Sequence, residues 1–235
     1  KLTSLADELN IEDSLLSGVI GIESLGLFSS NISSCKISTL YQGIHTLWMQ
    51  NSNLTKNIFD CTYGSNINFS GCYDIHIEEN LFRTSENGIL LSPFVFAENG
   101  QSSNTLITRN AAALVQLLEK TSSFMLQSYG VDYQKKLLTD EELKRAGEQI
   151  SFYFKAPQNT DQTLTLPMIN CNVTGNDFSC QEAGISFTEA SGIHSLDIVD
   201  NRFSSSESAI LLKNSTFSQN ETNALIFWQK KLSNL

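Results

Sequence analysis

The chain has 235 residues, 40% of them hydrophobic and 17% charged, which is enough apolar material for the core of one large domain or two small ones. Its formal net charge of −10 repels phosphate backbones, so nucleic acid is not expected as a partner. No apolar run approaches the roughly 20 residues of a membrane-spanning helix, so membrane insertion is not expected. Residue 1 is Lys and no basic, apolar leader is recognisable, so we expect an excised domain or a processed chain.

The first predicted element is a short amphipathic helix from Leu2 to Asn10, and beyond it the chain repeats itself. Three segments, which begin at Asn80, Asn176 and Asn201, share one template: Asn, any residue, Phe, five residues, Gly or Ala, Ile, any residue, then Leu or Phe. Less complete copies begin at Asp13, Cys35, Asn57 and Asn110. Most neighbouring copies are 22 to 25 residues apart, and each carries two strand-like stretches with no helix between them.

A repeat of 22 to 25 residues with two strands and no helix is compatible with few folds. The chain lacks the Leu-x-x-Leu-x-Leu pattern of a leucine-rich repeat, and a β-sandwich has no reason to repeat Asn-x-Phe at one spacing. A parallel β-helix does, because each coil stacks about 4.8 Å above the last and like positions meet in ladders. On these repeats the chain resembles the pectate-lyase-like superfamily of right-handed parallel β-helices over roughly 11–110 and 165–225. We therefore predict an all-β solenoid of about seven to eight coils of 22–25 residues, capped by the helix at its N-terminal end.

Each slot of the template has a physical role in such a coil. Asn tolerates a left-handed backbone in the tight turn between two strands, and stacked Asn amides donate and accept hydrogen bonds along the axis. Gly or Ala before the second strand permits a sharp corner. The Phe slot is predicted to point inward as an aromatic stack, made of Phe59, Phe82, Phe178 and Phe203.

The period breaks after the copy at Asn110. Residues 111–120 are rich in Ala and Leu, and the run from Thr139 to Glu142 is typical of a capping box, so short helices are predicted here. Within one domain, we expect the cap and first coils in 1–110, a helix-containing insertion in 111–163, and the remaining coils and C-terminal end in 164–235. The apolar run 224–228 is predicted to be a last strand or an end plug.

The cysteines show neither a complete pairing nor a metal motif. They number five, and none of their spacings is C-x-x-C, so neither zinc nor a redox motif is indicated. We interpret them as mainly reduced, small apolar fillers. They are Cys35, Cys61, Cys72, Cys171 and Cys180.

The candidate ligand-binding residues fall in the outward slots of the first strand of each repeat. This column is polar and suited to hydrogen bonding with sugar hydroxyls, and it contains Asn31, Asn53, His76, Asn172 and Asp197. Trp48 is a further candidate, because its ring could stack on a sugar; the alternative, which we favour, is that it covers a corner of the wall.

One constellation has acid-base potential. His76 and Glu78 share a strand, and Lys56 and Arg109 are expected near them, so these four are the candidate catalytic residues. The alternative, which we favour, is a solvated ladder of charges formed by Lys56, Glu79 and Arg109, each one residue before an anchor. No cluster of aspartates suits calcium and no metal site is predicted, so we expect no cofactor, with calcium conceivable only in a lyase.

Three functions remain open, and the first is preferred. It is a noncatalytic β-helix module of a larger surface, secreted or particle-borne protein, extracellular or at the cell surface, which serves as a rigid scaffold or recognises a carbohydrate or protein partner. The second is an enzyme: the resemblance to the superfamily implies a polysaccharide lyase or glycoside hydrolase acting on an acidic polysaccharide. The third is a self-assembly scaffold with contacts through the insertion and the outward Leu90 and Leu211.

Overall fold

The computed structural model describes residues 5–92, 94–96, 162–164, 168–190, 192–204, 207–215 and 217. These residues form an all-β structure, with one 15-stranded parallel sheet and one antiparallel pair. The large sheet contains β1 (Leu5–Asp7), β2 (Asn10–Glu12), β3 (Leu15–Phe28), β4 (Asn31–Ser33), β5 (Lys36–Thr55), β6 (Ile58–Cys61), β7 (Ile67–Glu78), β8 (Leu81–Thr84), β9 (Ile89–Leu91), β12 (Met168–Thr174), β13 (Asp177–Cys180), β14 (Ala183–Thr188), β15 (Ile193–Val199), β16 (Arg202–Phe203) and β17 (Ser208–Lys213). The pair is β10 (Phe94–Phe96) with β11 (Gln162–Leu164).

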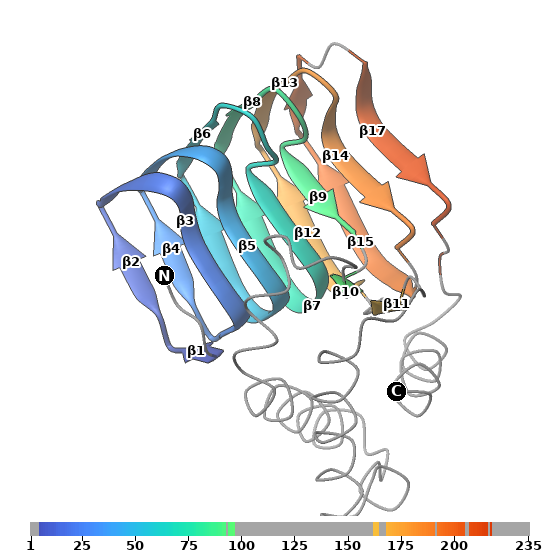
Figure 1. Ribbon diagram of the computed structural model, residues 1–235, viewed down its shortest axis with the longest axis horizontal. Helices are drawn as coiled ribbons and strands as arrows, with labels where there is room; N and C mark the ends of the chain where they lie inside the picture. Colours follow the sequence, from blue (N-terminus) through green and yellow to red (C-terminus); the bar gives the residue numbers. More distant parts are fainter. Residues whose placement is uncertain are drawn as a thin grey trace, which may run out of the picture.

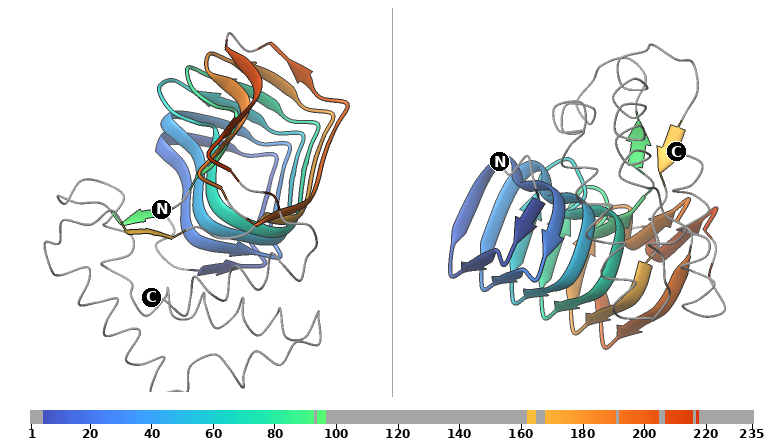
Figure 2. Two further views of the ribbon diagram at one scale, coloured as in Figure 1. Left: turned by 90° about the vertical axis from the view of Figure 1, so that its right-hand side faces the viewer. Right: turned by 90° about the horizontal axis from the view of Figure 1, so that it is seen from below.

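The large sheet winds into a parallel β-solenoid, in which each lap of the chain, here called a rung, lies directly against the next (Figures 1 and 2). Each rung passes through four walls in the same order, and the long strands β3, β5 and β7 run through their corners. The first wall contains β1 and residues 26–28, 48–50, 71–73, 168–169 and 193–194. The second contains β2, β4 and residues 53–55, 76–78, 172–174 and 197–199. The third contains residues 15–18 and 36–39, β6, β8, β13 and β16, and the fourth contains residues 20–24, 42–46 and 67–69, β9, β14 and β17.

The described residues form about six rungs, fewer than the seven to eight predicted. In the second wall the pairing runs through one position per rung: Asn10, Asn31, Asn53, His76, Asn172 and Asp197. The coil predicted at Asn110 accounts for part of the difference. Strand β7 pairs directly with β12, and β8 and β9 pair directly with β13 and β14, so no rung lies between them.

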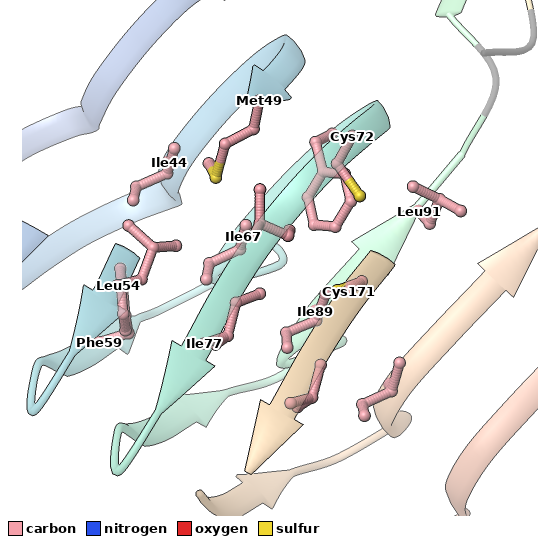
Figure 3. Close-up of a cluster of buried hydrophobic side chains, with 14 of the residues drawn as sticks. Ile44, Met49, Leu54, Phe59, Ile67, Cys72, Ile77, Ile89, Leu91 and Cys171 are labelled. Carbon is pink, nitrogen blue, oxygen red and sulfur yellow. The ribbon is translucent and has the colours of Figure 1, made fainter. Parts of the chain in front are cut away.

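The predicted aromatic stack is confirmed. Its rings lie 5.1, 4.7 and 4.9 Å apart between centroids and 5° to 10° from parallel, in the order Phe59, Phe82, Phe178 and Phe203. The first three rings are fully buried, and they belong to a core that continues through Ile44, Ile67 and Ile89 on the fourth wall (Figure 3). Burial of one ring removes on the order of 150–250 Å² from water, which makes this stack a principal stabiliser of the solenoid.

The predicted asparagine ladder is also confirmed. The side-chain oxygen of Asn80 accepts from the backbone N–H of Asn57 at 2.8 Å, and its amide donates to the backbone oxygen of Leu54 at 2.8 Å. Asn80 in turn bonds to Asn176, 96 residues further along the chain, and Asn176 to Asn201. The predicted left-handed conformation of Asn itself is wrong. It belongs to the residue before the anchor, at Ser34, Lys56, Glu79, Gly175 and Asp200. Asp13, predicted to be the anchor of the first copy, is left-handed as well, because the strand register places it level with Ser34 and so one residue before the true anchor position.

The small residue of the template is explained by the ring of the next rung. A Cβ added to Gly88 would lie 2.5 Å from Cδ1 of Phe178, and one added to Gly184 would lie 2.3 Å from Cδ1 of Phe203. Ala209 takes this slot on the rung of Phe203, the last ring of the stack. The slot is therefore small because it makes room for the phenylalanine of the following rung.

The predicted N-terminal helix is wrong for the residues described. Leu5–Asp7 and Asn10–Glu12 are strands β1 and β2, paired in parallel with residues 26–28 and with β4. Backbone hydrogen bonds to the second rung outweigh the helical pattern of so short a segment. The predicted helices of 111–163 lie outside the described residues, except that 162–163 belong to β11; the predicted strand or plug at 224–228 lies outside them too.

Candidate functional site

The column of polar side chains lies on the outer face of the second wall. Each strand of this wall has three residues, of which the middle one is buried inward: Ile32, Leu54, Ile77 and Val173 on four successive rungs. Strand alternation therefore turns the first and third residues outward. The first positions are the predicted ligand-binding residues Asn31, Asn53, His76, Asn172 and Asp197, which the structure brings into one row.

The members of this row, here called the outward column, are accessible. Asn53 and Asp197 are exposed, and the other three are partly buried. Asn31 donates to the side-chain oxygen of Asn10 at 3.2 Å, and the Thr174 hydroxyl donates to the side-chain oxygen of Asn172. Amides and hydroxyls in this state still have donors and acceptors to offer a ligand.

Two left-handed corners border the second wall and fix its geometry. One corner has Asn51, Asp74, Asn170 and Ser195 at positive φ on successive rungs, and the other is the corner before the asparagine ladder. The Asn170 amide donates to Asp74 at 2.6 Å across adjacent rungs. Because both corners repeat on every rung, the outward column is held straight and evenly spaced.

His76 is the only imidazole in the outward column, and carboxylates flank it on both sides. Its Nδ1 lies 3.4 Å from Oε1 of Glu78, and its Nε2 lies 4.0 Å from Oδ1 of Asp74. All three side chains are 40–44% exposed, so solvent screens their charges. The predicted pairing of His76 with Glu78 is therefore present, and Asp74 is a neighbour that the sequence analysis missed.

Lys56 belongs to a corner rather than to the outward column. Its Nζ lies 3.6 Å from the Glu79 carboxylate on the next rung, and both side chains are about two-thirds exposed. This is the solvated charge ladder that was weighed against a catalytic role for Lys56. Arg109, the fourth candidate, lies outside the described residues.

Trp48 cannot stack on a sugar in this structure. Its side chain is 0% exposed, and its indole N–H donates to Oε1 of Gln50 at 3.1 Å. This burial agrees with the alternative that Trp48 covers part of the wall. The continuous apolar run 47–49 is the signal for it, because a wall exposed on one side alternates and a wall buried on both sides does not.

The fourth wall carries an ionisable pair made of a buried glutamate and a partly buried histidine. Glu23 and His45 are register partners on adjacent rungs, and Glu23 is only 5% exposed. Burial lowers the pKa of His45, and the negative charge of Glu23 partly opposes that shift. The sequence analysis missed this pair, because nothing in the outward-slot pattern separates a covered position from an exposed one.

The five cysteines are free and buried, as interpreted from the sequence. Burial raises the pKa of the Cys61 thiol to about 11 and that of Cys180 to about 12, so both remain protonated near neutral pH. Burial, followed by the neighbouring Cys171, also raises the pKa of Cys72. A buried, protonated thiol is a poor nucleophile, which fits a packing role.

The described residues show neither a metal-binding cluster nor a membrane-spanning helix. They contain no group of three or more His, Cys, Asp or Glu side chains placed to hold a metal ion. Nor does any helix among them have the length and apolarity needed to cross a bilayer.

The candidate site is therefore a row of hydrogen-bonding side chains on a rigid wall, with one His–Glu pair inside it. Comparisons of the chain with protein-family models, with curated proteins and with solved structures give no match.

Proposed function

We propose that this chain is a noncatalytic recognition module in a larger surface or secreted protein, and that the outward column binds an extended carbohydrate. One observation supports this most directly: five side chains able to hydrogen-bond with hydroxyls stand in register on successive rungs of one accessible wall. A polymer lying along the solenoid axis would meet one such group per rung, about 4.8 Å apart.

The rigidity of the scaffold supports the same proposal. The asparagine ladder at the border of the second wall and the phenylalanine stack inside the third wall fix neighbouring rungs against each other. A surface that is already ordered loses little conformational entropy when it binds. Many weak hydrogen bonds can then add up to specific binding without a deep pocket.

The enzyme alternative depends on His76 and Glu78. The pair could move a proton, and Asp74 would favour the charged imidazole. A lyase also needs a cation to neutralise a uronate, and an inverting or retaining hydrolase usually needs a matched pair of carboxylates. The described part of the outward column supplies one acid-base pair, which favours binding over cleavage.

The self-assembly alternative depends on the apolar side chains that are exposed on the last described rung. Ile210, Leu212 and Phe217 are 42–55% exposed there, and Leu211 is 38% exposed. Leu90, the other predicted contact, is partly buried on the fourth wall, two rungs before Leu211. Analytical ultracentrifugation over a range of concentrations, with Leu211→Ser for comparison, tests this alternative.

A binding panel tests the proposal. The chain is titrated calorimetrically with neutral glucans, mannans, galactans and uronate polymers, next to the double variant Asn53→Ala/Asn172→Ala. Asp60→Asn, on the exposed face of the third wall, is the matched control. We expect one polymer class to bind the parent and the control equally and the double variant at least tenfold more weakly. Binding that is unchanged in the double variant contradicts the proposal.

The same polymers distinguish binding from cleavage. Each is incubated with the chain while reducing ends and the ultraviolet absorbance of unsaturated products are followed. Sustained turnover that His76→Ala abolishes would replace the proposal with the enzyme alternative.

A further inference from the structure

Positive charges avoid the wall that carries the outward column. The Lys and Arg side chains that the structure describes lie on the third wall, at the corner after the second wall and at the end of the fourth wall: Lys36, Arg83, Arg202, Lys56 and Lys213. The corner lysine, Lys56, has its Nζ 3.6 Å from the carboxylate of Glu79. A polymer that lies on the outward column therefore meets no unpaired lysine or arginine of the part of the chain that the structure describes.

Negative charges, in contrast, are present on the second wall. Glu12, Glu78 and Asp197 lie on its first, fourth and sixth described rungs. The middle residue of each of these strands packs against the core, so alternation turns the three carboxylates outward. Glu12 and Asp197 are exposed, and the Glu78 side chain is 40% exposed. All three are therefore accessible to a ligand on this wall.

The fourth rung stays negative in either charge state of its histidine. Nδ1 of His76 lies 3.4 Å from Glu78 and its Nε2 lies 4.0 Å from Asp74, so a charged imidazole is matched by one carboxylate while the other is left over. Its register partners on the neighbouring rungs, Asn53 and Asn172, are uncharged and cannot compensate the excess. An anionic ligand gains no net attraction from His76.

The three carboxylates are spaced so that their repulsion reaches every described rung of the second wall. The second rung lies beside the first, the third beside the fourth, and the fifth between the fourth and the sixth. Rungs are about 4.8 Å apart, and the Debye length at physiological ionic strength is about 8 Å. A carboxylate at any point along the column is therefore within one rung of a like charge, measured along the axis, and salt screens that repulsion only in part.

We propose that the outward column selects neutral polysaccharides, and that Glu12, Glu78 and Asp197 exclude polymers of uronic acids. This inference rests on the proposed function and narrows the class of its ligand. One contact between exposed charges is weak, but a uronate polymer on the wall would meet several of them at once. Neutral hydroxyls meet only hydrogen-bonding groups, so the carboxylates act against the wrong ligand and not against the right one. The same charges disfavour the acidic polysaccharide that the enzyme alternative requires.

Two forms of one polymer test the proposal: the neutral polymer that binds the chain best, and the same polymer after chemical oxidation of its C6 hydroxyls to carboxylates. Calorimetry gives both affinities at neutral pH and low ionic strength, with a chelator present so that divalent cations cannot bridge carboxylates. We expect the oxidised form to bind the parent roughly tenfold more weakly than the neutral form, because several exposed like-charge contacts add up. This ratio should shrink in about 1 M salt, where the Debye length is about 3 Å.

A pair of double variants locates the effect on the second wall. Glu78→Gln/Asp197→Asn removes two of its carboxylates, and should lower the ratio to about threefold or less because the repulsion is lost. Asp60→Asn/Asp177→Asn, the matched control, removes as many carboxylates from the third wall and should keep the ratio of the parent.

The outcomes separate this inference from the function on which it rests. An oxidised polymer that binds as well as the neutral one, or better, overturns the inference and leaves carbohydrate binding in place. So does a ratio that Glu78→Gln/Asp197→Asn leaves unchanged, or one that falls equally in the control. If neither form of any polymer binds, the proposed function and the inference are both wrong.

Discussion

Two outer surfaces of the same solenoid behave in opposite ways. On the second wall the outward column is polar and accessible, from Asn31 to Asp197. Where the fourth wall turns into the first, side chains outside the hydrophobic core cluster are just as deeply buried as the core: Leu25, Leu47, Trp48 and Ile169 are 0–2% exposed. We call this second surface the buried outer wall.

The difference shows that "outward" and "solvent-exposed" are separate properties in a solenoid. Alternation along a strand decides which side chains leave the core, and it does so in the same way on both surfaces. Residue type then differs: amides and hydroxyls on the second wall, and aliphatic and aromatic groups on the buried outer wall. The residue types on an outward face therefore distinguish a face that is exposed to solvent from a face that is buried.

Of the substitutions that test this contrast, truncation of Trp48 should lower the free energy of unfolding most. Trp48→Ala removes a fully buried indole and the hydrogen bond to Gln50, and we expect it to lower the free energy of unfolding by roughly 3–5 kcal/mol. Urea unfolding measures the loss. Tyr41→Ala, at a side chain that is 53% exposed, is the control and should cost far less. Equal losses in the two variants would mean that the buried outer wall is not buried in solution.

The next largest loss of stability should come from Asn80, in the asparagine ladder at the border of the second wall. Asn80→Ala removes the acceptor of the Asn57 N–H and the donor to the Leu54 oxygen, and both of these are backbone groups of buried residues. Each buried group left unpaired costs about 1–3 kcal/mol, so the variant should be clearly destabilised. Chemical denaturation gives the size, and hydrogen exchange at the Asn57 amide should accelerate in the variant. An Asn57 amide that stays protected would show that the ladder bond is dispensable.

The features that repeat were predictable, because ladders require equivalent residues at equivalent positions. The phenylalanine stack, the asparagine ladder and the row of outward-column residues all follow from the spacing of Asn80, Asn176 and Asn201. The left-handed position was misplaced by one residue, because Lys56, Glu79 and Asp200 share no residue type that would reveal it.

Features that depend on one rung or on contacts between distant segments were not predictable. The helical pattern of residues 2–10 was too short to outweigh strand pairing at the solenoid end. Direct pairing of β7 with β12 cannot be deduced from a spacing that the intervening chain interrupts. The Asp74 neighbour of His76 and the Glu23–His45 pair depend on corners and burial, which a period does not encode.

Glu86, at the corner between the third and fourth walls, gives a smaller, pH-dependent effect. Burial, together with the negative charge of Glu182, raises the pKa of Glu86 in the folded state, so folding favours the protonated acid, and its destabilising effect grows as pH rises from the unfolded pKa through the folded one. Glu86→Gln should therefore raise stability at pH 7, by less than about 1 kcal/mol because the group is partly solvated. The gain should shrink near pH 4, where the parent carboxyl takes up its proton. Thermal unfolding at the two pH values measures the difference, and a gain that is larger at the acidic value would contradict the assignment.

The smallest effect should come from Asn53, an exposed member of the outward column. Asn53→Ala changes an exposed side chain whose strand is fixed by the buried Leu54 behind it, so stability should stay within about 0.5 kcal/mol of the parent. Asn53 and Asn80 have the same side chain, and only their placement on the rung differs. The pair therefore separates two roles of asparagine: the ladder asparagines hold the rungs together, and the asparagines of the outward column are the ones that we propose bind a ligand. A loss from Asn53→Ala as large as that from Asn80→Ala would show that the outward column is a structural ladder, and the case for a binding surface would then fail.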